Sequence, residues 1–382
     1  MAPRMNSTLN SSHEGLEPPR HSQNSIRAAY YRGGTSRAVM LRLEDLPANR
    51  EQWCDIFRGL IGSPDPWGRQ LDGMGVGLSS LSKVCVVGPS THPEADVDYT
   101  FAAIGVEDPV VDFSANCGNM TFAVGPFAVD SGSVAARPDE HGLVTVRILN
   151  TNTNKIIHAK FPVEGGEAAA RGDFSIDGVH GSAAKSQLTF IRPGGSKTGR
   201  LLPTGSAVDV FDSIRTTCLD AGNPCCFVQA EDVGLHGTIF PADLDNNKEV
   251  MAKLELIRRK AGVRMGLAAT ENDVPVSIPK LGLVFMPSPA DKGNIVVRAL
   301  SVGQAHRALP VTVALSAAIS ARTAGTVVSE CLRGTGPETS IVLMHPTGLL
   351  VVDAEVASDG EVSSATVYST ARRLMEGTAF WK

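Results

Sequence analysis

Residues 308–321, ALPVTVALSAAISA, are apolar on nearly every side of the helix that their composition predicts. A helix without a polar face has to be enclosed by other elements, because a surface helix keeps one side for water. A second apolar segment with helical spacing begins near Asn116. Strand-like runs surround both segments. The sequence therefore predicts an α+β fold with two similar domains, each a sheet wrapped round a central helix.

The strand-like runs fall into two sets, one for each central helix. An outer helix is expected over 248–262, where the apolar residues form one stripe. The predicted strands of the first half are 28–31, 38–41, 84–87, 97–102, 144–149 and 156–161, and those of the second half are 225–228, 281–286, 295–300, 341–344 and 349–352.

A Gly- and Ala-rich polar stretch, residues 164–187, is where the boundary between the two halves is expected. We predict domains over 27–170 and 171–382, with the last segment a candidate to return to the first domain. Residues 1–26 are rich in Ser, Asn and Pro and poor in large apolar residues, so a disordered tail is expected.

Composition and spacing limit the partners, compartment and metal content that the chain is expected to have. The net charge of -5 argues against a nucleic-acid partner, which normally needs a basic face. No apolar run approaches the roughly 20 residues that span a membrane. The seven cysteines are odd in number and irregularly spaced, which predicts a reducing, cytoplasmic compartment instead of a disulfide framework. No metal-ligand motif occurs, so no metal is expected.

One cysteine, Cys117, stands between Asn116 and Gly118 where the first central helix is expected to begin. The unpaired N–H groups of a helix N-terminus stabilise a thiolate or a bound carboxylate. Gly118 keeps the approach to these amides clear of a side chain. The alternative is that Cys117 is a small buried apolar residue.

A second candidate anion site is RGGTSR, residues 32–37. Arg32 and Arg37 can form paired hydrogen bonds to carboxylates, Gly34 lets the backbone approach, and Thr35 and Ser36 add hydroxyl donors. The alternative is a hairpin turn with two solvated arginines.

Seven segments together resemble the PrpF family, in the family's order and at similar spacing. Together they span about residues 27–377 and read YYRGGTSRAVML (30–41), QLDGMGVGLSSLSKVCVV (70–87), DFSANCGNMTFAVGPF (112–127), LLPTGSAVDVFD (201–212), AGNPCCFVQAEDVGLHGT (221–238), HPTG (345–348) and ARRLMEG (371–377). The family belongs to the diaminopimelate-epimerase-like superfamily of cofactor-independent isomerases. The resemblance implies two facing central helices and an active site in the cleft between the domains.

The resemblance also places Lys83 in the active site. A lysine acts as a base only if its pKa is lowered by desolvation or a neighbouring cation. Where epimerases carry a second cysteine, this chain reads VGQAHRALP (302–310), so Lys83 and Cys117 are the expected acid–base pair. His236 is expected to be a structural turn residue. The further candidates for substrate contacts are Ser79, Ser80, Ser82, Asn119, Asn223, His306 and Arg307, together with Asn116 and Gly118.

The resemblance implies an isomerase of small unsaturated polycarboxylates that needs no cofactor. Our preferred reaction is conversion of cis-aconitate to trans-aconitate by allylic proton transfer. The alternatives are 2-methylaconitate cis-trans isomerisation, 4-oxalomesaconate tautomerisation and methylitaconate isomerisation. A further alternative is a non-catalytic accessory protein for an aconitase-type dehydratase. The expected partner is a small polycarboxylate, and the assembly considered is a homodimer.

Overall fold

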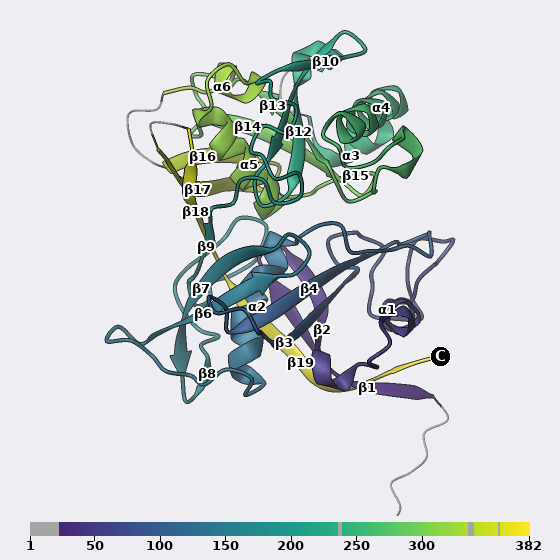
Figure 1. Ribbon diagram of the computed structural model, residues 1–382, viewed down its shortest axis with the longest axis vertical. Coiled ribbons are helices and arrows are strands. Elements are labelled where there is room, and N and C mark those ends of the chain that lie inside the picture. Colours follow the sequence, from purple (N-terminus) through teal and green to yellow (C-terminus); the bar gives the residue numbers. More distant parts are fainter. Residues whose placement is uncertain (1–22, 236–238, 335–339, 358–359) are drawn as a thin grey trace, which may run out of the picture.

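The computed structural model of the chain describes residues 23–235, 239–334, 340–357 and 360–382. Figure 1 shows two lobes, one built from the first half of the chain and one from the second, with one helix at the centre of each. These helices are α2 (Gly118–Asp130) and α5 (Val311–Arg322). The last strand, β19 (Ala371–Trp381), lies in the first lobe beside β1 (Asn24–Gly33).

The two sheets repeat one pattern of pairing. In each, two antiparallel strands are followed by a parallel, an antiparallel, a parallel and an antiparallel neighbour. The first set is β1, β2 (Ser36–Arg42), β3 (Lys83–Pro89), β4 (Val97–Ile104), β6 (Leu143–Asn150) and β7 (Lys155–Glu164). The second is β11 (Ile214–Asp220), β12 (Pro224–Gln229), β13 (Lys280–Phe285), β14 (Ile295–Ser301), β16 (Ser340–His345) and β17 (Gly348–Val356). The two lobes are thus similar domains, as predicted.

Two strands join the sheets. β9 (Ser186–Ile191) pairs with β7 on one side and with β18 (Val362–Ser369) on the other, and β18 pairs with β17. Hydrogen bonding therefore runs without a break from the first sheet into the second. The remaining short strands are β5 (Val111–Asp112), β8 (Glu167–Ala168), β10 (Asp209–Phe211) and β15 (Gln304–Ala305). The predicted domain boundary at 170/171 lies between β8 and β9 and stays a prediction.

Both central helices are enclosed, as the absence of a polar face requires. Every residue of α2 from Gly118 to Val129 is buried, and so is every residue of α5 from Val311 to Ala321. The helix expected near Ala308 starts at Val311, because Pro310, in the N-cap position, has the non-helical angles φ -59° and ψ 132°. The apolar side chains of both helices belong to one continuous core that crosses from one lobe to the other.

Four further α-helices are described. α4 (Lys248–Arg264) is the expected outer helix and packs Leu254, Ile257 and Ala261 against the second sheet. The sequence analysis did not predict α1 (Trp53–Ile61), α3 (Pro241–Asn246) or α6 (Val327–Glu330). All seven cysteines are free thiols. No helix among the described residues is both long and apolar enough to cross a membrane.

Candidate active site

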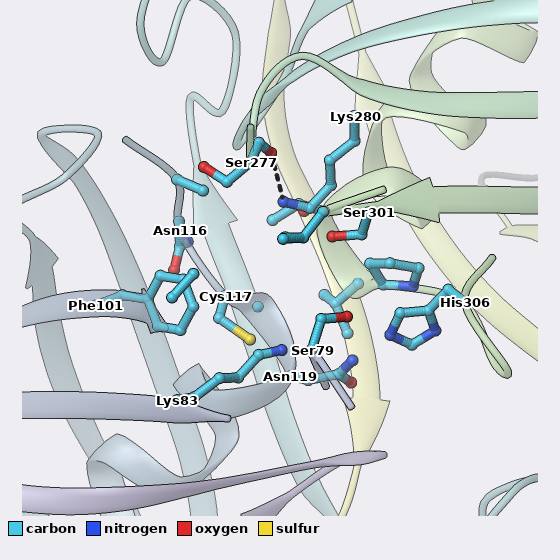
Figure 2. A pocket seen from close by; sticks show the side chains of 17 residues that line it. Ser79, Lys83, Phe101, Asn116, Cys117, Asn119, Ser277, Lys280, Ser301 and His306 are labelled. Atoms are coloured by element: carbon cyan, nitrogen blue, oxygen red, sulfur yellow. Dashed lines mark hydrogen bonds between the residues drawn. The ribbon is translucent and has the colours of Figure 1, made fainter. Parts of the chain in front are cut away.

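A pocket lies where the N-termini of α2 and α5 meet (Figure 2). The empty space within it, including the part open to solvent, is about 470 Å³. Both halves of the chain supply its walls. The lining residues are Ser79, Lys83, Phe101, Ala103, Ala115, Asn116, Cys117, Gly118, Asn119, Ser277, Lys280, Ser301, Val302, His306, Pro310, Val311 and Thr312.

The two helix ends approach each other closely because residue 118 is glycine. A Cβ built on Gly118 would lie 2.8 Å from both Cβ and Cγ1 of Val311, the first residue of α5. The first backbone N–H groups of each helix have no partner within the helix and carry partial positive charge. The pocket therefore receives the positive ends of two helix dipoles.

Cys117 is the N-cap residue of α2 and is extended, with φ -105° and ψ 93°. Its carbonyl accepts hydrogen bonds from the backbone N–H and the Oγ1 of Thr121, both at 3.0 Å. The carbonyl is thus turned into the helix while the side chain faces the pocket, where Figure 2 shows the sulfur. Cys117 is only partly buried, whereas Cys85, on neighbouring β3, is fully buried.

Asn223 holds the cysteine loop in place from the second half of the chain. Its Oδ1 accepts a hydrogen bond from the Asn116 backbone N–H at 2.8 Å. Its Nδ2 donates to the Asn116 carbonyl at 2.7 Å and to Thr312 Oγ1 at 3.1 Å. Asn223 is fully buried and does not line the pocket. Its contacts position the pocket wall, and the substrate contact expected of it stays a prediction.

Lys83 is the first residue of β3 and is 9 % exposed. Its amino group lies 3.5 Å from Ser36 Oγ and 5.9 Å from the centre of the Phe101 ring. Figure 2 shows this amino group pointing into the same space as the Cys117 sulfur. The structure therefore brings together the two residues expected to form the acid–base pair.

The sequence analysis missed Lys280, a second buried lysine in the pocket. Lys280 is the first residue of β13, which occupies in the second sheet the place of β3 in the first. Burial lowers the pKa of Lys280 below its ordinary value. A sequence signal existed, because SLSKV (80–84) and SIPKL (277–281) share a serine three residues before the lysine. Finding it requires comparing the two halves residue by residue.

His306 lines the pocket next to the start of α5. Its Nδ1 accepts a hydrogen bond from the Ala308 N–H at 3.2 Å. Burial, followed by the positive charge of Lys83, lowers the pKa of His306 to about 3. The imidazole is therefore neutral near pH 7, with Nε2 as its remaining donor.

The lining of the pocket favours an anion. No aspartate or glutamate occurs among the described residues that form its walls, while two lysines do. Two buried donors in the wall, Asn116 Nδ2 and Ser277 Oγ, have no hydrogen-bond partner in the protein. Unsatisfied buried donors are rare in folded proteins and call for an explanation such as a ligand. No group of described residues has the composition of a metal site.

The RGGTSR segment forms the β1–β2 hairpin, and neither arginine lines the pocket. Arg32 donates to the carbonyls of Gly34 and Thr370, at 3.0 and 2.9 Å. Arg37 lies over the Tyr30 ring at 5.7 Å. A Cβ on Gly34 would lie 2.3 Å from Asn119 Oδ1, so the hairpin packs directly on the start of α2. In this structure Arg32 binds main-chain carbonyls at the hairpin, and the carboxylate clamp stays a prediction.

The other candidate residues divide between the pocket and its surroundings. Ser79, Asn116, Gly118, Asn119 and His306 line the pocket. Ser82 is bonded to the Leu78 carbonyl, and the Ser80 carbonyl accepts from the Arg37 N–H. Ser36 contacts Lys83, Thr35 borders a neighbouring hollow, and Arg307 is exposed. His236 lies outside the described residues.

Comparison with known proteins decides the family. The model of the PrpF protein family matches residues 23–382. The chain belongs to the PrpF family. It is 38 % identical to a 3-methylitaconate isomerase of Eubacterium barkeri, over 94 % of this chain and 97 % of the relative. It is 37 % identical to a 2-methyl-aconitate isomerase of Shewanella oneidensis, over 95 % and 97 %.

Solved structures agree with this membership. A methylitaconate-delta-isomerase crystal structure superimposes with a TM-score of 0.75 at 37 % identity, covering 94 % of this chain and 96 % of the other. A hydroxyproline epimerase from Agrobacterium vitis shares the fold, with a TM-score of 0.59 at 12 % identity over 93 % and 92 %. The predicted fold class is confirmed. As a PrpF protein with relatives of this kind along nearly its whole length, the chain is an isomerase.

Proposed function

We propose that this PrpF protein isomerises small unsaturated polycarboxylates by allylic proton transfer, with Lys83 and Cys117 as its acid–base pair. The observation that carries the proposal is the pocket itself. It holds a thiol and an amino group that point into the same space, has donors on both walls, and contains no acidic side chain among its described residues. The preferred reaction is cis-aconitate to trans-aconitate.

The chemistry requires one base, one acid and a means of stabilising negative charge. One member of the pair removes a proton from the carbon next to the double bond. The electron pair left behind spreads through the double bond into a carboxylate, giving a dienolate, and the other member returns a proton at the far end. The double bond moves, and with it the cis or trans geometry. No electrons are gained or lost overall, so the reaction needs no redox partner.

Carbon acids resist deprotonation, so most of the catalytic effect has to come from stabilising the dienolate. Preorganised donors and positive charge in a site shielded from water serve this purpose. Here the two helix N-termini and the buried lysines are fixed before substrate arrives. Proton transfer by a correctly placed side chain adds about 100-fold to 10,000-fold.

The names of the relatives limit the class of substrate but do not identify one compound. Their names give 3-methylitaconate, 2-methylaconitate and, for a Novosphingobium relative 38 % identical over 95 % of this chain, (4E)-oxalomesaconate. These compounds are small unsaturated polycarboxylates, which supports the proposed class. The second candidate is 2-methylaconitate, because relatives from two organisms carry that name.

The test is proton NMR of the purified chain in heavy water with cis-aconitate, 2-methylaconitate, 4-oxalomesaconate and methylitaconate in separate samples. We expect double-bond migration with deuterium incorporation for at least one of them. Lys83→Ala and Lys83→Arg should both stop isomerisation, since a guanidinium does not release its proton near neutral pH. Loss of deuterium exchange in both would identify Lys83 as the base. Persistent exchange without isomerisation would make it the acid.

The same experiment separates the enzyme from an accessory protein. Turnover by the purified chain alone supports the enzyme. If every substrate stays unchanged while still binding, the pocket is a sensor for carboxylates and the proposed function is wrong.

A further inference from the structure

Lys280 and Lys83 are equivalent by the internal repeat of the fold. Each begins a strand that is parallel to the preceding strand of its sheet and antiparallel to the next, and each reaches the pocket from its own half. The equivalence ends at the helices, because α2 is capped by Cys117 and α5 by Pro310. The second half therefore offers a lysine without a neighbouring thiol at the helix start.

We propose that Lys280, Ser277 and Asn116 form a subsite that binds one carboxylate of the substrate, across the pocket from Lys83 and Cys117. This inference rests on the proposed function, because it assigns the residues that select a polycarboxylate at the same site. Lys280 would act through binding and through stabilising the dienolate charge, while proton transfer stays with the other pair.

The three residues supply donors that the protein leaves unused. The Lys280 amino group makes one hydrogen bond, to the Ser277 carbonyl, at 3.3 Å. An ammonium group has three N–H donors, so two remain. The Ser277 hydroxyl and the Asn116 amide nitrogen are buried and have no partner. Donors without acceptors are complementary to a carboxylate, which only accepts when ionised.

The surroundings of Lys280 do not neutralise it. Lys280 forms no ion pair with any of the described residues. Cys225, its neighbour on β12, is a neutral thiol because burial raises its pKa to about 12. Lys83 and Cys117 face it from the first half of the chain, and His306 is neutral. Asp112 is nearby and its charge favours the charged form of Lys280, but it forms no ion pair with it; its oxygens accept from the N–H groups of Ser114 and Ser277, at 2.7 and 3.1 Å.

The subsite is held rigidly from both halves. Arg258, itself 7 % exposed, donates to the carbonyls of Pro275 and Ile278, at 2.8 and 3.1 Å. Asp112 of β5 fixes the Ser277 N–H, and Asn223 fixes the backbone of Asn116. A site organised in advance binds without first ordering its own groups, which favours affinity.

Binding should also move a proton. Burial lowers the pKa of Lys280 in the free protein, and a bound carboxylate restores the charged form. Between the free and the bound pKa, complex formation therefore takes up a proton. Above the bound pKa and below the free pKa it does not.

The experiment is isothermal titration calorimetry with propane-1,2,3-tricarboxylate, a saturated compound that binds without turnover. Titrations in buffers of different ionisation enthalpy, at several pH values between 7 and 10, give both the Kd and the number of protons taken up. The variants are Lys280→Met, Lys280→Arg and Ser277→Ala. The control is Lys185→Met, which removes an exposed lysine that stacks on Tyr368 outside the pocket.

We expect Lys280→Met to weaken binding at least tenfold and to reduce the proton uptake. Lys280→Arg should keep more affinity than Lys280→Met and show the same reduced uptake, because guanidinium stays charged. Ser277→Ala should weaken binding about threefold or more at unchanged Tm, since its hydroxyl has no partner in the free protein. Lys185→Met should behave as the wild type.

Wild-type affinity and proton uptake in both Lys280→Met and Ser277→Ala would overturn the inference. If Lys280→Met fails to fold, the affinity and proton uptake of Ser277→Ala and Lys280→Arg decide whether the inference holds. An active wild type whose Lys280→Met variant binds normally would leave the proposed function intact. A wild type that isomerises nothing, but binds the tricarboxylate through Lys280, would leave the inference intact and remove the function.

Discussion

Asn223→Ala is the substitution that most directly tests how the two halves organise the pocket. The change removes both hydrogen bonds to the backbone of Asn116, which is 1 % exposed. Each buried polar group left without a partner costs about 1–3 kcal/mol, so the free energy of unfolding should fall by about 2–6 kcal/mol. Urea denaturation followed by circular dichroism measures that loss.

The variant should also change the chemistry of the adjacent residue, Cys117, because the loop that carries it is no longer fixed. We expect slower isomerisation and an altered rate of Cys117 alkylation by iodoacetamide, followed by mass spectrometry. Asn150→Ala is the matched control. Asn150 is fully buried and bonds to the Tyr99 carbonyl and to Thr153, but it does not line the pocket.

Asn150→Ala should lose comparable stability while its folded fraction keeps wild-type turnover. Two outcomes would refute the reasoning. One is a loss below about 1 kcal/mol in Asn223→Ala. The other is equal turnover and equal Cys117 alkylation in the two variants, which would show that the clamp has no influence on the site.

Three further predictions follow from the pocket. Cys117→Ser should preserve the fold but lower turnover about 100-fold or more, and wild-type turnover would remove the thiol from the mechanism. Gly118→Ala should cost about 1–3 kcal/mol by pushing on Val311, and combining it with Val311→Ala should recover part of that loss in a urea titration. His306 is protonated near pH 6.5 in the unfolded chain but only near pH 3 when folded, so its contribution to stability is complete above pH 6.5 and falls by about 1.4 kcal/mol per pH unit below it. His306→Gln should flatten that dependence between pH 7 and 5, and an unchanged slope would contradict the assignment.

The enclosed helices and most core strands were predictable because burial in the core requires apolar side chains, and these show in the sequence. α2 and α5 have no polar face, so the sequence alone requires a sheet around each. β19 was not predicted as a strand because most of its residues are exposed. Its sequence therefore lacks the alternation of apolar and polar residues that marks a half-buried strand. Its partner, β1, lies at the other end of the chain.

The site was partly predictable for a similar reason. Cys117 was found because the apolar residues that follow it have helical spacing, which places the thiol at a helix N-terminus, where the backbone N–H groups stabilise a thiolate. Arg32 and Arg37 were predicted to bind a carboxylate, and the sequence does not reveal that main-chain carbonyls accept hydrogen bonds from Arg32. Lys280 was missed because its environment is made by burial and by Ser277 and Asn116 from two halves of the chain.

The pairing of β1 with β19 has a consequence for how the protein is made. The first domain cannot complete its sheet until residues 371–381 have left the ribosome, long after β1 has emerged. Contacts between such distant segments form slowly, because a long loop has to close first. During that interval β1 has an unpaired edge, the kind of surface on which chains aggregate. Removing β19 should therefore lower the yield of folded protein during synthesis even though the residues of the pocket are all still present.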